Sequence, residues 1–164
     1  MIIGRFSTVT PISLFRIQAG VKVRLRSEAL ARAAGRKSFD IAEREGGVVV
    51  PVDPAVPEFL GPNGMSMRPA GRMLAVIVGT FRSSKALLYE VPAGTRIPTS
   101  LVLLHEHSDH YSMQPAERMP LARLNAALTT FLSQEEVIRH ASIDAFYEKH
   151  PDHHPTKVGF SENA

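Results

Sequence analysis

Segments that predict strands and helices do not alternate regularly along this chain of 164 residues, and that order is the strongest constraint on its fold. Apolar or alternating stretches predict strands at 12–20, 21–26, 46–52, 65–69, 86–91, 100–107 and 110–115. Amphipathic stretches predict helices at 28–35, 69–81, 121–132 and 133–150. Because a helix does not follow every strand, a doubly wound parallel sheet does not fit. The order predicts an α+β fold.

Capping residues place the ends of the predicted helices. Ser27 is a candidate N-cap for the helix that follows it, and Pro69 suits the first turn of another. Ser133 and Glu136 have the spacing of a capping box, which predicts that the last helix begins there and ends near His150.

The bulk composition is that of one globular domain. We place this domain at 1–150, followed by a flexible tail at 151–164. Apolar residues make up 44% of the chain, enough for a buried core, and the absence of Cys excludes disulfides and thiolate metal sites. No apolar run approaches the roughly 18 to 20 residues of a membrane span, and the start of the chain lacks a signal-peptide layout. We therefore expect a cytoplasmic location in the producing cell.

Basic residues are concentrated near the N-terminus. The net charge is +3, with a pI near 9.5. The concentrated bases are Lys22, Arg24, Arg26, Arg32, Arg36 and Lys37. We interpret the segment as a solvated helix and strand edge. The alternative is a surface that meets phosphates or an acidic partner.

The sequence HEHSDH, 105–110, has the H-x-H-x-D-H pattern by which the metallo-β-lactamase superfamily holds two metal ions. Imidazole and carboxylate groups are good zinc ligands, so His105, His107, Asp109 and His110 are candidates for a metal site. That superfamily takes further ligands from later loops, however, and here the pattern lies late in the chain. The Gly-Gly that usually follows the pattern is also absent. We predict no metal here and keep a metal-dependent hydrolase as an alternative.

A second set of short motifs runs through more of the chain. The motifs are LFR at 14–16, GMSMRP at 64–69, PAGTRIP at 92–98 and HYSMQPA at 110–116, followed by the helix at 121–132. In this order and spacing they resemble the ADP-ribosyltransferase-like toxins typified by a type VI secretion exported effector, which have bacterial and fungal relatives.

The resemblance implies a split β core of two small sheets with flanking helices, and NAD bound in a cleft between the sheets. Such enzymes break the bond between nicotinamide and ribose through an oxocarbenium-like transition state. They then transfer ADP-ribose to an acceptor, which can be a protein or a nucleic acid, or cleave NAD with water. The resemblance also implies delivery to the cytosol of a target cell, a cognate immunity protein as partner, and no membrane insertion.

The resemblance assigns roles on the first two strands of the cleft. Arg16 is placed to grip the cofactor, and a guanidinium suits phosphate well. The alternative is an Arg that pairs with a carboxylate at a strand end. Ser66 is placed to order the site, and Gly64 allows the backbone to approach a ligand closely. Tyr111 is a candidate for stacking on the cofactor.

The third strand departs from the wider superfamily, which carries a Glu that stabilises the oxocarbenium. Here that place holds a His-Tyr pair, as in the toxin group that the chain resembles. The candidates for the role of the Glu are His110, Gln114, Glu106 and Asp109. A neutral His or Gln offers no full negative charge and stabilises a cation less well. A non-enzymatic binding module of the same fold is therefore a further alternative.

Overall fold

The computed structural model describes residues 2–52 and 61–154. Its strands are β1 (Gly4–Phe6), β2 (Leu14–Ala19), β3 (Val48–Val49), β4 (Met65–Met67), β5 (Ala86–Val91), β6 (Leu101–His107), β7 (His110–Pro115), β8 (Met119–Pro120) and β9 (Ile138–His140). Its helices are α1 (Glu28–Ala33), α2 (Arg72–Thr80), α3 (Leu121–Leu132), α4 (Ile143–Lys149) and the short 3-10 helix η2 (Pro151–His153). The predicted α+β class is confirmed.

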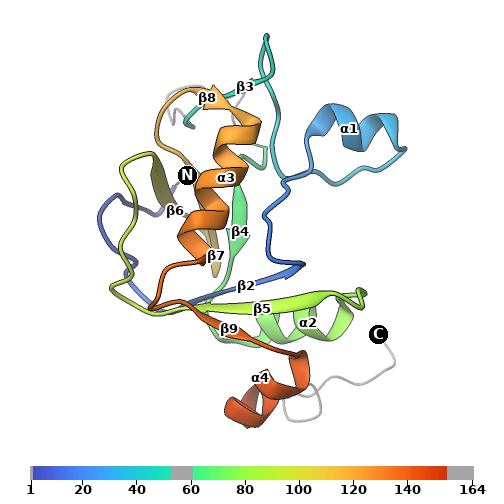
Figure 1. Ribbon diagram of the computed structural model, residues 1–164, viewed down its shortest axis with the longest axis vertical. Coiled ribbons are helices and arrows are strands. Elements are labelled where there is room, and N and C mark those ends of the chain that lie inside the picture. Colours follow the sequence, from blue (N-terminus) through green and yellow to red (C-terminus); the bar gives the residue numbers. More distant parts are fainter. Residues whose placement is uncertain (1, 53–60, 155–164) are drawn as a thin grey trace.

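Two small antiparallel sheets form the framework. One has the strand order β1-β6-β7-β4, the other has the order β2-β5-β9, and their strands cross steeply in Figure 1. Phe15 of β2 and Arg68, just after β4, join the sheets through a pair of backbone hydrogen bonds of 2.7 and 3.1 Å. A separate two-stranded pair, β3-β8, lies at one end of the molecule. The split β core with flanking helices is thus confirmed.

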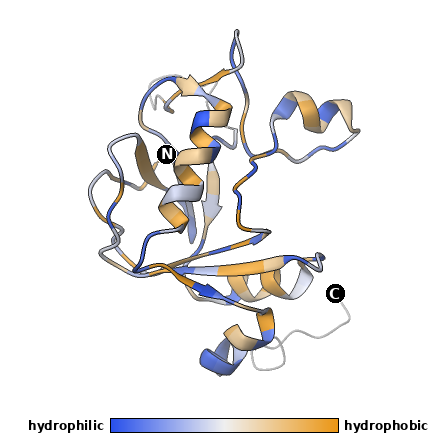
Figure 2. Cartoon of the chain, in the orientation of Figure 1, coloured by the Kyte–Doolittle hydropathy of each residue, from blue (hydrophilic) through white to orange (hydrophobic). Residues whose placement is uncertain are grey.

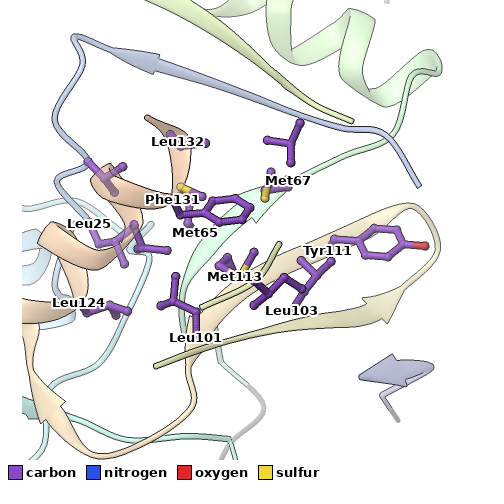
Figure 3. Packing of buried hydrophobic residues seen from close by; sticks show 14 of the residues in the cluster. Leu25, Met65, Met67, Leu101, Leu103, Tyr111, Met113, Leu124, Phe131 and Leu132 are labelled. Carbon is purple, nitrogen blue, oxygen red and sulfur yellow. The ribbon is translucent and has the colours of Figure 1, made fainter. Parts of the chain in front are cut away.

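Helix α3 covers one face of the four-stranded sheet. Its buried face presents Leu124, Leu128, Phe131 and Leu132. These side chains pack against apolar residues that β4, β6 and β7 direct to the same side, including Met65, Met67, Leu101, Leu103 and Met113 (Figure 3). Because side chains alternate along a strand, this packing directs the intervening polar residues of β4 and β7 to the opposite face. That polar face carries the candidate site.

The three-stranded sheet has its own apolar layer, formed with α2 and α4. Its buried members are Phe15, Ile17, Leu74, Val78, Leu88 and Phe146. Figure 2 shows the hydrophobic stretch of β5 lying directly over α2. Arg16, between two residues of this layer, points to the other face of β2 and toward the four-stranded sheet.

The predicted strand at 21–26 is wrong, although its side chains do alternate between buried and exposed positions. The backbone N–H of Val23 donates to Thr129 Oγ1 at 2.9 Å, and that of Leu25 donates to Asn125 Oδ1 at 3.1 Å. The segment is therefore extended along side chains of α3, and these hydrogen bonds take the place of a strand partner.

The predicted helix at 133–150 is also wrong in its first half. Ser133 caps the end of α3, and its hydroxyl donates to the carbonyl of Thr129 at 2.7 Å. The chain then forms β9, so His140 lies in a strand. Helix α4 begins after Ser142, whose hydroxyl accepts a hydrogen bond from the N–H of Ala145 at 3.0 Å.

Smaller differences concern the ends of other elements. The predicted strand at 46–52 contracts to β3, and α2 begins at Arg72 rather than at Pro69. The N-cap at Ser27 is confirmed by its hydrogen bond from the N–H of Leu30 at 3.2 Å. Strand β1 was not predicted. Of the predicted tail, 151–154 form a short 3-10 turn, and the remainder lies outside the described residues.

Candidate active site

Ser66, His110 and Glu106 form a continuous polar chain on the face of the sheet opposite α3. Nε2 of His110 lies 3.0 Å from the hydroxyl of Ser66. Nδ1 of the same ring lies 2.7 Å from Oε2 of Glu106, a close electrostatic contact that is not aligned as a hydrogen bond. The side chains of His110 and Glu106 are only 16% and 21% exposed. Partial shielding from water strengthens both interactions.

An irregularity in the β6-β7 hairpin explains why Glu106 reaches this chain. The strand pairing shifts between His105 and His107, and Ser108 at the turn has a positive φ of 49°. Such a shift leaves one residue of a strand without a direct partner, and here that residue is Glu106. Its carboxylate consequently lies beside His110, four residues later.

A buried amide network fixes the other oxygen of Glu106. Oε1 of Glu106 accepts hydrogen bonds from Gln114 Nε2 at 3.0 Å and from the hydroxyl of Ser112 at 3.2 Å. Gln114, which is fully buried, accepts in turn from Asn63 Nδ2 at 3.1 Å. Glu106 is thus held on both oxygens by the strand beside it.

The environment of Glu106 favours its ionised form. Burial raises the pKa of this carboxyl group, but the close contact with His110, the hydrogen bond from Ser112 and the nearby charges of His110 and His107 more than offset this effect. The pKa of Glu106 is therefore below its ordinary value. An ionised carboxylate therefore lies on β6, beside the first residue of β7.

The other candidates named from the sequence have different places. Asp109 forms an ion pair with Arg68. Tyr111 is buried on the core face and stacks on His105, with ring centroids 4.1 Å apart. At Gly64, a Cβ atom would lie 2.3 Å from the backbone oxygen of Met113. The observed close approach at Gly64 is therefore to β7.

The four His and Asp groups of the HEHSDH pattern are not brought to one point. His105 is engaged with Tyr111 and with the carbonyl of Ser108, and Asp109 is engaged with Arg68. The group of ligand atoms that does converge here consists of Glu106, His107 and His110. Two of these three already belong to the network that ends at Ser66.

A cleft of about 810 Å³ runs along the free edge of β2, past the end of β4 and over α2. Arg16 lies in it, with Nη1 donating to the carbonyl of Ser66 at 3.3 Å and Nε donating to Gln18 Oε1 at 3.4 Å. Apolar groups of α2 and its C-cap line another side, including Leu74, Ile77 and Phe81. The volume is within the range of small-molecule sites.

The cleft is strongly cationic. Its basic lining residues are Arg16, Lys22, Arg24, Arg26, Arg36, Arg68 and Arg82, and its acidic lining residue is Asp40. Asp40 pairs with Arg26 at 3.2 Å, and Arg68 pairs with Asp109. Within 2–52 and 61–154, the other five basic side chains form no ion pair with a carboxylate.

Among the cations of the cleft, Arg16 has a pKa below its ordinary value. Burial lowers the pKa of its guanidinium, Asp40 counteracts this effect, and the charge of Arg26 adds to it. A partly buried cation without a carboxylate partner is poised to bind an anion. Of the two alternatives drawn from the sequence, pairing with a carboxylate at a strand end is not observed among the described residues.

The cationic lining revises the interpretation of the N-terminal bases. Lys22, Arg24, Arg26 and Arg36 are exposed, as a solvated face requires, yet all four line the cleft. Arg32 instead pairs with Glu28 on α1. The run of basic residues was the sequence signal for the exposed part of this lining. The packing of 21–26 against α3 decides which way these basic side chains face.

Two polar residues of the site were missed in the sequence. Asn63 and Ser112 were missed because nothing in their local sequence indicates a buried network.

Two small antiparallel sheets, joined beside a cationic cleft with Arg16 and Ser66 at its base, define an ADP-ribosyltransferase-like protein. The family model for the Tse2 ADP-ribosyltransferase toxin matches residues 12–141, and the chain therefore belongs to that family of toxins. No curated protein matches the chain. Among the described residues, no helix combines the length and apolar character needed to cross a membrane.

Proposed function

We propose that this toxin binds NAD in the cationic cleft and breaks the bond between nicotinamide and ribose. The bond electrons leave with nicotinamide, and the anomeric carbon is captured by an oxygen or nitrogen of an acceptor, or by water. The observation that carries the proposal is the contact of Arg16 with Ser66. It joins a cation that has no carboxylate partner among the described residues to the backbone of Ser66, whose hydroxyl ends the Ser66–His110–Glu106 chain.

The charges and shape of the cleft support a dinucleotide ligand. Arg16 and the exposed bases along 22–36 offer several donors to a pyrophosphate, and a guanidinium binds phosphate through two parallel hydrogen bonds. The apolar side chains of α2 offer a surface for a base or for nicotinamide. A single cleft thus provides both kinds of surface that NAD requires.

In this proposal Glu106 takes the electrostatic role of the missing third-strand Glu. Its carboxylate is ionised and partly shielded from water, and His110 connects it to the hydroxyl of Ser66, which lines the cleft. His110 holds the Ser66 hydroxyl, which orients the ribose or the acceptor. His110 can also accept the proton that the acceptor releases on capture, with Glu106 stabilising the resulting imidazolium.

The test measures nicotinamide release from NAD by the purified chain. Arg16→Ala, Ser66→Ala and Glu106→Gln should each lower the rate at least about tenfold, the effect of losing one positioned charge or hydrogen bond. Glu28→Gln and Arg32→Ala provide matched controls, because these two residues pair with each other on α1 away from the cleft. Full activity of Ser66→Ala and Glu106→Gln would overturn the proposed chemistry. NAD binding without nicotinamide release would instead support a binding module.

The positive charge of the cleft also indicates the chemistry of the ADP-ribose acceptor and of the immunity protein. The five lining cations that have no carboxylate partner within 2–52 and 61–154 favour a polyanionic acceptor, or an acidic immunity protein that fills the cleft in the producing cell. We place the action of the toxin in the cytosol of the target cell, where NAD is supplied. Co-purification with an acidic partner that blocks nicotinamide release would support this part of the proposal.

A further inference from the structure

Glu90, His140 and His150 converge on one point on the face of the three-stranded sheet opposite Arg16. Oε2 of Glu90 lies 3.0 Å from Nε2 of His140 and 3.3 Å from Nε2 of His150. The three ligand atoms all lie within 4.8 Å of one another. None of these residues lines the cationic cleft. The cluster is therefore separate from the proposed NAD site.

The fold fixes each member of the cluster. In the ladder between β5 and β9, His140 lies opposite Leu88, two residues along the strand from Glu90, so both side chains share one face. His150 follows α4, and its N–H donates to the carbonyl of Phe146 at 2.8 Å. The buried ring of Phe146 packs against both imidazoles, with centroid distances of 5.5 and 5.0 Å.

The spacing of the ligand atoms is that of a metal site. Zinc binds His nitrogen and carboxylate oxygen at about 2.0–2.2 Å, so neighbouring ligands of a tetrahedral ion lie about 3.3 Å apart. The two contacts of Glu90 Oε2 are close to this separation, and one oxygen atom is shared by both imidazoles. Two His and one Glu, with a fourth position open to water, form an established zinc donor set.

We propose that Glu90, His140 and His150 bind a divalent transition metal ion, for which zinc has the matching donor chemistry. Binding would tie α4 to β5 and β9 and so hold the C-terminal helix against the sheet that carries Arg16. The site does not depend on the proposed NAD chemistry.

One competing cation lies beside the cluster. Nζ of Lys149 lies 3.4 Å from Oε2 of Glu90 and its side chain is 49% exposed. The Lys149 side chain can therefore turn to solvent when a metal ion takes its place.

The second converging group, Glu106 with His107 and His110, provides an internal comparison. Glu106 and His110 are already engaged with Ser66, Ser112 and Gln114, and His107 is exposed. Glu90 and the two imidazoles of the proposed site are instead engaged chiefly with one another. We therefore assign the metal to the Glu90 cluster and use His107 as the control.

The test titrates the full chain, first treated with a chelator, with Co²⁺ and then with Zn²⁺. We expect one Co²⁺ per chain with the intense visible absorption of a four-coordinate ion, and its displacement by Zn²⁺. Glu90→Gln and His150→Ala should each weaken Co²⁺ binding at least about tenfold. Removing a residue that only hydrogen-bonds to a metal ligand already lowers metal affinity about tenfold, and these two residues are the ligands themselves. His107→Ala should leave the affinity unchanged.

Three results would overturn the assignment: no four-coordinate spectrum, unchanged affinity in both Glu90→Gln and His150→Ala, or loss of binding in His107→Ala. Circular dichroism checks that each variant is folded. A measurement on the wild-type chain makes the test independent of the variants. Co²⁺ should broaden the NMR signals of the His140 and His150 rings and leave those of His105 and His107 sharp. The reverse pattern would overturn the assignment.

Discussion

The guanidinium of Arg16 donates a hydrogen bond to the backbone oxygen of Ser66 at 3.3 Å, across 50 residues of sequence. This contact links the first strand of one sheet to the edge strand of the other. It also fixes the direction of a cation that has no carboxylate partner in the described part of the chain. The position of the Arg16 guanidinium, which we propose to bind phosphate, is therefore set by its contact with the strand that carries the Ser66 hydroxyl.

Replacing Arg16 by Lys should weaken NAD binding even though the charge is kept. A Lys ammonium cannot reproduce the planar fork that contacts Ser66 and a phosphate at once. Loss of a hydrogen bond to a charged group costs about 1.5–3 kcal/mol, which corresponds to about 10- to 150-fold in affinity. Isothermal titration calorimetry with NAD measures the change. Arg32→Lys, on α1 away from the cleft, should bind like the wild type.

The stabilising effect of Glu106 should depend on pH in a defined direction. Its pKa is lowered in the folded chain, so its contribution to stability is present above the unfolded pKa of about 4.3. That contribution is lost as the pH falls through the folded value. The difference in free energy of unfolding between wild type and Glu106→Gln should therefore be larger at neutral pH than in acid.

Urea unfolding at several pH values between neutrality and acid measures this difference. Glu117→Gln is the control, since Glu117 is 55% exposed and pairs with Arg123 at the surface. A difference that stays constant across the range would contradict the proposed environment of Glu106.

Gly64→Ala should destabilise the fold. The added Cβ would lie 2.3 Å from the backbone oxygen of Met113 and 3.0 Å from Cγ of Gln114, and the backbone of β7 cannot yield easily. Overpacking of this kind costs about 1–3 kcal/mol, or roughly 2–12 °C in melting temperature for a chain of this size. Thermal unfolding measures the shift. At Gly71 an added Cβ meets nothing within 4 Å, so an equal loss in Gly71→Ala would contradict the steric explanation.

Asn125→Ala should loosen the segment that precedes α1. The change removes the acceptor for the N–H of the buried Leu25, and an unpaired buried donor costs about 1–3 kcal/mol. Amide hydrogen exchange should accelerate at Leu25. Arg123→Ala, at an exposed position of the same helix, should leave that amide protected.

Strong local periodicity made several elements predictable. The segments at 86–91, 110–115 and 121–132 coincide residue for residue with β5, β7 and α3, because their burial patterns follow from their own sequences. The segment at 21–26 has the same alternating pattern, yet its partners are side chains of α3 about a hundred residues later. Alternation shows which side chains are buried, but it does not show what the backbone binds.

The candidate site was predictable only in its motif positions. Arg16, Ser66 and His110 were named from short motifs, and the structure brings them within a few contacts of one another. Glu106 was one of four candidates for the missing carboxylate. The pairing shift in the hairpin, which no residue pattern reveals, brings it to His110 and leaves Asp109 to pair with Arg68. The cationic lining likewise required the tertiary path of the N-terminal segment.

The backbone bridge between Phe15 and Arg68 ties the two sheets together beside the cleft. The two sheets meet there through two hydrogen bonds, and Arg16, the next residue after Phe15, contributes its side chain to the cleft. A ligand bound to Arg16 would therefore act on the residue next to the connection between the two sheets.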